Sequence, residues 1–118
     1  VGNAMAVDQA TTFGDAIARE LKEEGVVDGV ILTSTWGTDT RCGATLVKQI
    51  DAAGIPAVHI CTVTPISMSV GANRIIPGIS IPHPTGQPSL VRKEEKEIRK
   101  SLLRNALKAL ATPVDGQP

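Results

Sequence analysis

Hydrophobic residues recur along this chain with two different periods, which predict an alternation of helices and strands. Residues 13–24 carry apolar side chains at helical spacing with charged residues opposite them, and Gly25 ends the segment. Residues 42–53 and 93–111 repeat the helical pattern, the last with a long stripe of Leu, Ile and Ala. Three amphipathic helices are therefore expected.

Short apolar runs between these helices predict three strands, at residues 26–33, 55–62 and 74–81. Pro77 argues for an edge position of the third strand, because proline donates no hydrogen bond to a sheet. Residues 64–73 fit either a short helix with a proline in its first turn or a long loop.

A helix between two strands implies a parallel pair with a right-handed crossover. We therefore predict a single α/β domain over residues 1–118: a three-layer, Rossmann-like or flavodoxin-like half with a short, mostly parallel sheet and helices on both faces. Residues 1–11 are small and polar, and an irregular lead-in is expected there. Three helices cover such a sheet only in part, so we expect an oligomer or a partner that continues the sheet. A self-sufficient small domain is the alternative.

Composition narrows the classes of function. Twelve acidic and twelve basic side chains cancel, so no broad attraction to nucleic acid or a membrane surface is expected. One Trp, one Phe and no Tyr leave few rings on which bases would stack. Two irregularly spaced cysteines, no signal-peptide pattern and no long apolar run favour a reducing cytoplasm. The opening residues, Val1 to Ala4, are typical of the middle of a longer or processed protein.

Polar residues that carry chemistry are concentrated at positions 33–42, between the first predicted strand and the next helix. In an open α/β sheet, the carboxyl end of a strand and the amino end of a helix face one crevice there, and the helix end offers N–H groups to an anion. Trp36, the single tryptophan, lies at the crest of this turn, and Cys42 is expected where the helix begins.

Several of these side chains have two open interpretations. A helix N-terminus beside Arg41 would favour the thiolate of Cys42, which is otherwise a small apolar residue closing the loop against the sheet. Asp39 either caps the helix or orients a substrate amine, and Arg41 either holds a carboxylate in a bidentate pair or is solvated. Cys61, within an apolar strand, is expected to be inert core.

The two histidines differ in their surroundings. His59 lies within a strand and is expected to be structural, whereas His83, between two prolines in a loop, is the better acid–base candidate. Asn73 and Arg74 form a polar pair that we expect to face the same crevice as the loop. The sequence contains no metal-ligand spacing, phosphate-binding loop or dinucleotide fingerprint.

Residues 31–45, ILTSTWGTDTRCGAT, closely resemble the selenocysteine loop of the selenoprotein subunit of component B in the glycine, sarcosine and betaine reductase family. Further agreement lies in AVHICTVTPI (57–66), VGANRIIP (70–77) and IPHP (81–84). The resemblance covers nearly all of the chain and implies the C-terminal portion of a larger reductase subunit.

This resemblance implies reductive deamination of a small amine. In the family, component B binds the amine partly through a pyruvoyl group on another subunit, and the selenolate attacks the activated α-carbon and releases the amine. The carboxymethyl group then passes to a second selenoprotein, and acetyl phosphate and a thioredoxin-type reductant complete the cycle. No cofactor is expected on this chain itself. The candidate substrate-binding residues are Thr35, Gly37, Thr38, Arg41, Asn73, Arg74 and His83.

Two positions depart from the family pattern, in which selenocysteine stands at the place of Trp36 and cysteine at that of Asp39, while Cys42 matches a further cysteine. These three are the candidate catalytic positions. Tryptophan is no nucleophile, so the chain as written is expected to be inactive. Selenocysteine is encoded by UGA and tryptophan by UGG, so Trp36 is a misread UGA, a deliberate substitution or a real change. Misreading does not explain Asp39.

Two alternative functions involve no covalent chemistry. In the first, a diverged homologue uses Trp36 to line a pocket for a small amine or carboxylate. In the second, the chain is a structural subunit that completes a partner's sheet.

Overall fold

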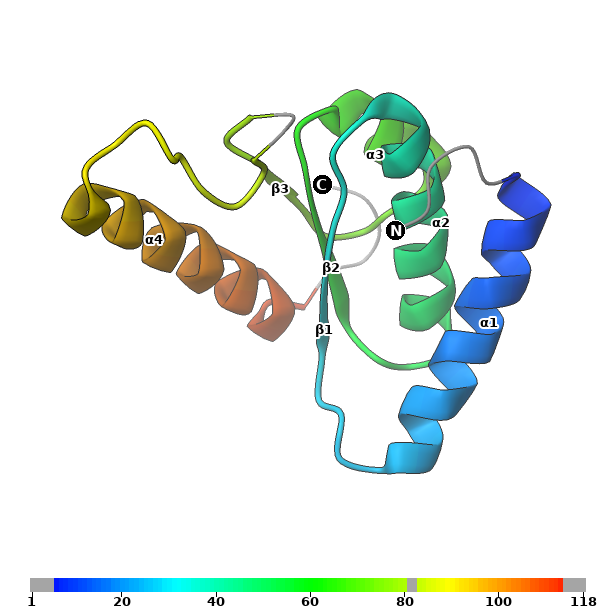
Figure 1. Cartoon of the computed structure of the whole chain (residues 1–118). Helices are drawn as coiled ribbons and strands as arrows, with labels where there is room; N and C mark the ends of the chain where they lie inside the picture. Colours follow the sequence, from blue (N-terminus) through cyan, green and yellow to red (C-terminus); the bar gives the residue numbers. More distant parts are fainter. Residues whose placement is uncertain (1–5, 81–82, 114–118) are drawn as a thin grey trace.

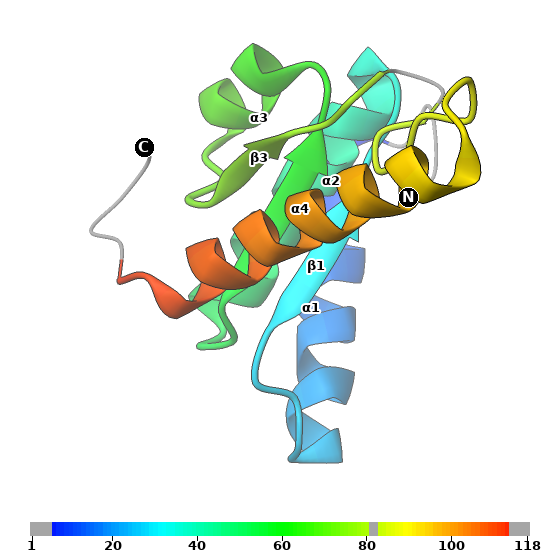
Figure 2. The same ribbon diagram turned by 90° about the vertical axis from the view of Figure 1, so that its left-hand side faces the viewer.

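The computed structural model describes residues 6–80 and 83–113, which form helices around a three-stranded sheet (Figures 1 and 2). In chain order the elements are α1 (Val7–Glu24), β1 (Val30–Thr33), α2 (Gly37–Ala52), β2 (Ala57–Cys61), α3 (Thr64–Val70), β3 (Ile75–Pro77) and α4 (Arg92–Ala111). The predicted α/β class is confirmed. The open segment at 64–73 contains a short helix, so the described residues hold four helices rather than three. None of these helices is long and apolar enough to cross a membrane.

The sheet is parallel throughout, with the order β1-β2-β3. Its register pairs Leu32 with His59 and His59 with Ile75. All five residues of β2 are buried, as expected for a central strand covered on both faces. β3 lies at the edge, as Pro77 predicts, and the ladder ends there.

Helices cover both faces of the sheet, as predicted. α2 and α3 lie on one face and α4 lies across the other (Figures 1 and 2). α1 packs on the outer side of α2 rather than directly on the sheet. Two apolar clusters result: one between α1, α2 and the sheet, around Val47 and Ile50, and one between α4 and the sheet, around Val58 and Leu102.

The helix α1 begins at Val7, so the expected irregular lead-in is wrong for residues 7–11, while residues 1–5 lie outside the described part. Its contact with α2 includes the small residues Gly14 and Ala18, which are both buried, as is Ala10 in the same helix. A Cβ at Gly14 would lie 2.9 Å from Cβ of Gln49, so the two helices approach closely. A search for large apolar residues misses such a contact.

The other bounds also shift, for local reasons. β1 begins at Val30 and not at residue 26: Val26 is 80% exposed, and pairing starts where the Val30 N–H donates to Pro56 O. The second helix begins at Gly37 and not at Cys42, because the Thr- and Asp-rich run forms its first turn rather than a loop. Thr40 donates through both its N–H and its hydroxyl to Trp36 O, at 2.8 and 2.7 Å.

Candidate functional site at the start of α2

Trp36 is the N-cap residue of α2, directly after the carboxyl end of β1. Its side chain is 59% exposed, and it makes no side-chain capping hydrogen bond. The first N–H groups of an α-helix have no partner within the helix, and its dipole places partial positive charge there. A side-chain atom at position 36 therefore faces solvent beside a helix end that favours negative charge.

Asp39 braces this turn from inside. Its Oδ2 accepts the backbone N–H of Thr35 at 2.8 Å and the Thr35 hydroxyl at 3.1 Å. The predicted cap would accept hydrogen bonds from N–H groups of the helix. The Asp39 carboxylate instead accepts them from Thr35, which precedes the helix. Thr62, directly after β2, donates a hydrogen bond from its hydroxyl to Thr35 O at 3.2 Å. Asp39 is only 6% exposed, and its Oδ1 has no hydrogen-bond partner among the described residues.

A buried hydrogen-bonded chain lies beneath the turn. His59 Nε2 lies 2.7 Å from Ser34 Oγ, and His59 Nδ1 lies 2.8 Å from Ser67 Oγ of α3. A neutral imidazole donates a hydrogen bond at one ring nitrogen and accepts one at the other, so it can bond to both hydroxyls. Burial lowers the pKa of His59 from 6.5 to about 4, against the opposing effect of the Asp39 carboxylate. The predicted structural role of His59 agrees with this arrangement.

Gly43 allows α2 to lie directly over this chain. A Cβ at Gly43 would overlap Ser34 Oγ and would lie 2.7 Å from His59 Nε2. Sequence reasoning missed Ser34, Ser67 and Gly43. The only local signal was a histidine in the middle of an apolar strand, which must find polar partners when it is buried.

Both cysteines lie in the core. Cys42 falls in the second turn of α2 and is fully buried, so the expectation that it starts the helix is wrong. Its thiol is therefore not at the helix end that was expected to activate it. Cys61 is fully buried in β2, as predicted, and burial raises the pKa of its thiol against the opposing hydrogen bond from Ser67.

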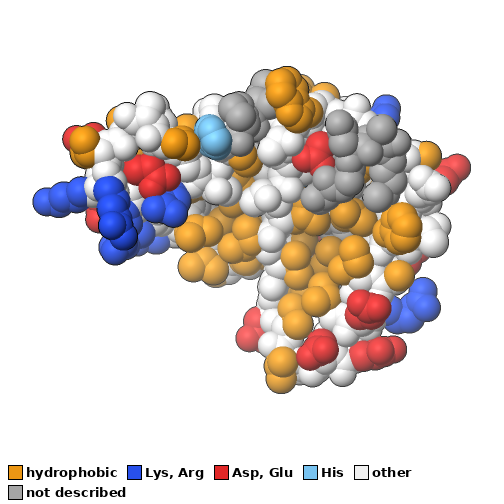
Figure 3. Space-filling model, in the orientation of Figure 1, with side chains coloured by type: hydrophobic (Ala, Val, Ile, Leu, Met, Phe, Trp, Pro, Cys, Tyr) orange, Lys and Arg blue, Asp and Glu red, His pale blue; other side chains and the backbone are white. Residues whose placement is uncertain are grey.

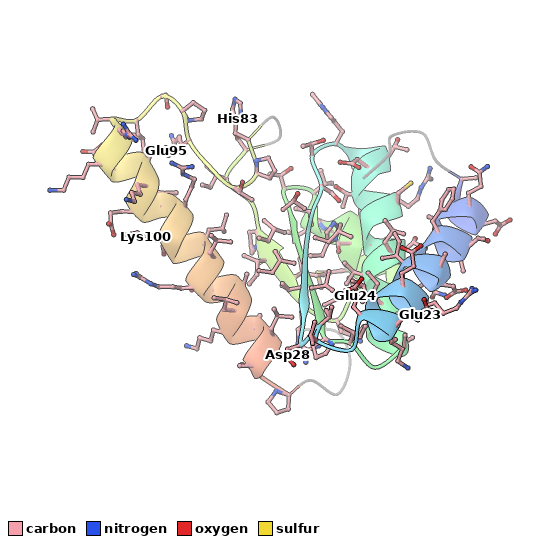
Figure 4. All side chains as sticks on the ribbon, turned by 60° about the horizontal axis from the view of Figure 1, so that its bottom comes forward. Glu23, Glu24, Asp28, His83, Glu95 and Lys100 are labelled. Carbon is pink, nitrogen blue, oxygen red and sulfur yellow. The ribbon has the colours of Figure 1, made fainter. Side chains whose placement is uncertain are left out.

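The remaining candidates are divided between the two ends of the sheet. Thr35, Gly37 and Thr38 are half-buried around Trp36, and Arg41 is exposed in the same helix. His83 is exposed in the loop after β3 (Figure 4), where it lines a pocket of about 350 Å³ with residues of the 79–80 and 87–89 segments. All of these follow the carboxyl ends of strands.

Asn73 and Arg74 precede β3 and therefore lie at the opposite, amino edge of the parallel sheet, so the prediction that they share the crevice is wrong. Asn73 Nδ2 donates to Asp51 Oδ2 at 2.6 Å, and Arg74 forms a 3.4 Å ion pair with Asp51. Arg74 also donates to the carbonyls of Ala109 and Thr112 at the end of α4. These bonds tie α2, β3 and α4 together.

No group of three or more His, Cys, Asp or Glu side chains within residues 6–80 and 83–113 could hold a metal ion. The polar residues gathered at the start of α2 instead offer an exposed helix terminus, a braced turn and an uncharged buried support. Such a site suits a reacting or bound group that carries negative charge.

Several known proteins are similar to this chain. The glycine reductase complex component B subunit gamma of Carboxydothermus hydrogenoformans is 60% identical over 117 residues, which are 99% of this chain and 27% of that protein. The sarcosine reductase complex component B subunit beta of Peptoclostridium acidaminophilum is 54% identical over 98% of this chain and 26% of its own length. The betaine reductase complex component B subunit beta of the same organism is 45% identical over 99% and 26%.

No family model matches the sequence, and no solved structure matches it. The chain spans about a quarter of the length of the curated relatives. The match to the subunits of all three reductase complexes nevertheless extends over nearly the whole of this chain. Over nearly its whole length, the chain is thus similar to one segment of the component B subunits of the glycine, sarcosine and betaine reductase complexes.

Proposed function

We propose that this chain is the segment of a component B subunit that presents the reacting atom, at position 36, for reductive deamination of a small amine. The observation that carries the proposal is the exposed N-cap position of Trp36 at the carboxyl edge of the sheet. The names of the relatives support the reaction class. In the form described here Trp36 has no nucleophilic atom, and we expect this form to be inactive.

A selenocysteine at position 36 would supply an anionic nucleophile that displaces the amine from the substrate α-carbon. The fit is good, because a short side chain at an N-cap lies next to the helix N–H groups and its anion is stabilised by them. The bonds from Thr35 to Asp39 hold the backbone before this position in place. Arg41, exposed on α2, is our candidate for holding the substrate carboxylate.

Within the proposal, the substrate amine is activated on another component B subunit, which carries the pyruvoyl group, and the product is accepted by a second selenoprotein. The reaction takes place in the cytoplasm. The similarity to subunits of multi-component complexes supports the need for partners. It favours none of the three amines, since glycine, sarcosine and betaine reductase subunits all match.

The proposal is tested by the chemistry of a thiol at position 36. In Trp36→Cys, the pH dependence of alkylation by iodoacetamide gives the pKa of the new thiol. We expect it to be lower by about one unit or more than that of a thiol placed at Ser101, which is exposed within α4. Equal pKa values in the two variants would show that the start of α2 does not activate a nucleophile. The proposed role of position 36 would then be refuted.

The source gene supplies an independent test. A TGA codon at position 36 with a selenocysteine insertion signal supports the reductase proposal. A TGG codon removes the nucleophile from the natural protein and leaves the binding role for Trp36 as the better explanation.

A further inference from the structure

The strand β1 leaves one side of the sheet open. It pairs with β2, and no other strand of the described residues lies beside it. The N–H of Val30 donates to Pro56 O and that of Ser34 to Ile60 O, at 2.9 and 3.0 Å. Successive N–H groups of a strand point to opposite sides, so those of Ile31 and Thr33 face outward. A row of hydrogen-bonding groups therefore remains at this edge.

The open edge strand is short, with four residues, but it lacks the side chains that discourage pairing at an edge. The sequence of β1, VILT, has no charge and no proline, either of which would discourage pairing. Figure 3, in which β1 faces the viewer, shows hydrophobic side chains gathered on both sides of a central strip of backbone and other side chains. Such a surface is suited to another strand with apolar side chains on both faces.

On the α4 side, Ile31, Leu103 and Leu107 are 36%, 46% and 58% exposed. α4 packs against β2 and β3, and its residues Asn105 and Lys108 line a cavity with β3. By helical periodicity, Leu103 and Leu107 lie on the opposite flank of α4, toward β1. These two and Ile31 form the first apolar flank of the edge.

On the other side of the strip, Figure 3 shows further exposed hydrophobic side chains, and α1 separately exposes Phe13 and Ile17, at 51% and 38%. Beside the unpaired strand itself, Ile31, Leu103 and Leu107 make three large exposed apolar side chains. Monomeric proteins rarely leave such a group exposed beside an open sheet edge.

The length of the relatives indicates what occupies this edge. The chain spans about a quarter of its relatives, so a complete subunit has roughly three times as much sequence again outside the matched segment. Sheets most often have four to six strands, and this one has three. We infer that a β-strand from the remaining part of the same reductase subunit pairs with β1 and covers both apolar flanks. This inference rests on the proposed function, in which the chain works as a segment of a component B subunit.

Charge adds a detail to the expected partner strand. Glu23, Glu24 and Asp28 are exposed near the start of β1 (Figure 4). A strand with aliphatic residues at alternate positions and a Lys or Arg at the end beside Asp28 matches this edge best.

The test combines this chain with the part of the Carboxydothermus glycine reductase subunit that it does not match, produced as a separate polypeptide. We expect a one-to-one complex in size-exclusion chromatography with light scattering. In the complex, amide exchange measured by NMR should slow at Ile31 and Thr33, whose N–H groups face outward. The amides of Val30 and Ser34 already bond to the segment around β2 and should change far less.

Two variants and a control locate the contact. Ile31→Lys places a charge in the edge itself, and Leu107→Lys places one on the α4 flank; each should weaken the complex at least tenfold. Val91→Lys, at a residue 64% exposed just before α4, should bind like the unchanged chain. All three sites are exposed, and circular dichroism checks that each variant is folded.

Three outcomes would overturn the inference. One is the absence of a complex at tens of micromolar. Another is a complex in which exchange at Ile31 and Thr33 is unchanged. The third is a homodimer of this chain alone that Ile31→Lys abolishes, since a second copy would then occupy the edge. Each is distinct from failure of the proposed function, which is read from the thiol pKa at position 36.

Discussion

Replacement of Gly43 by alanine should destabilise this protein, although the same change stabilises most helices. Alanine within a helix is favoured over glycine by about 1 kcal/mol. Here the new methyl group would overlap Ser34 Oγ and lie 2.7 Å from His59 Nε2 and 3.1 Å from Leu32 Cδ2. We expect both a displacement of α2 from the sheet and the loss of the hydrogen bond between Ser34 and His59.

The magnitude follows from these contacts. Overpacking a core costs about 1–3 kcal/mol, and leaving a buried polar partner unsatisfied costs about 1–3 kcal/mol. After subtraction of the helix preference, we expect Gly43→Ala to lower the free energy of unfolding by about 3 kcal/mol. For a chain of this length, that corresponds to a fall in Tm of about 10 °C.

The assay is urea unfolding followed by circular dichroism, with Gly37→Ala as the matched control in the same helix. A Cβ at Gly37 has only Ile66 Cδ1 nearby, at 3.5 Å, so its stability should stay within about 1 kcal/mol of the parent. In a Ser34→Ala background, the cost of Gly43→Ala should fall by about 1 kcal/mol or more, because the overlapping hydroxyl is gone. If Gly43→Ala were as stable as the parent protein, the close approach of α2 to His59 would be refuted.

Two further predictions concern the groups beneath the turn. His59 has a pKa of about 4 when folded against 6.5 when unfolded, so the unfolded chain binds the proton first as the pH falls. The contribution of the neutral His59 to the free energy of unfolding should be fully present above pH 6.5. That free energy should decline by up to about 3 kcal/mol as the pH falls to 4. His59→Gln should lose this part of the pH dependence, and an unchanged slope would contradict the assignment. Cys42 and Cys61 are fully buried, so both should react with a thiol reagent only as fast as the protein opens, and rapid modification of either in the folded state would contradict the core placement.

The helix and strand pattern could be predicted from the sequence because it depends on local periodicity. Most differences between the predicted pattern and the structure lie at the ends of helices and strands. The start of α2 was misplaced because Thr, Ser and Asp favour turns as well as first helical turns, and only the bonds of Thr35 with Asp39 decide between the two. The start of α1 was missed because residues 7–12 include no large apolar side chain except Val7, and the buried Ala10 carries little hydrophobic signal.

The strand-to-helix turn that holds the candidate site was predicted from the sequence, but the internal structure of the turn was not predictable. The sequence separates Ser34 from His59 by 25 residues, and their hydrogen bond exists because neighbouring parallel strands bring them together. Arg74 binds Ala109 O across 35 residues, which places it at the amino edge and removes it from the crevice.

The sequence by itself determined the α/β class, the position of the chemically rich turn and the resemblance to a reductase family, since each is written in consecutive residues. Tertiary structure alone decided which end of the sheet each polar residue occupies, that His59 is held uncharged between two serines, and that β1 is left with an open edge. Those properties depend on how layers pack and which strands are neighbours, and burial and pairing are defined only once distant segments meet.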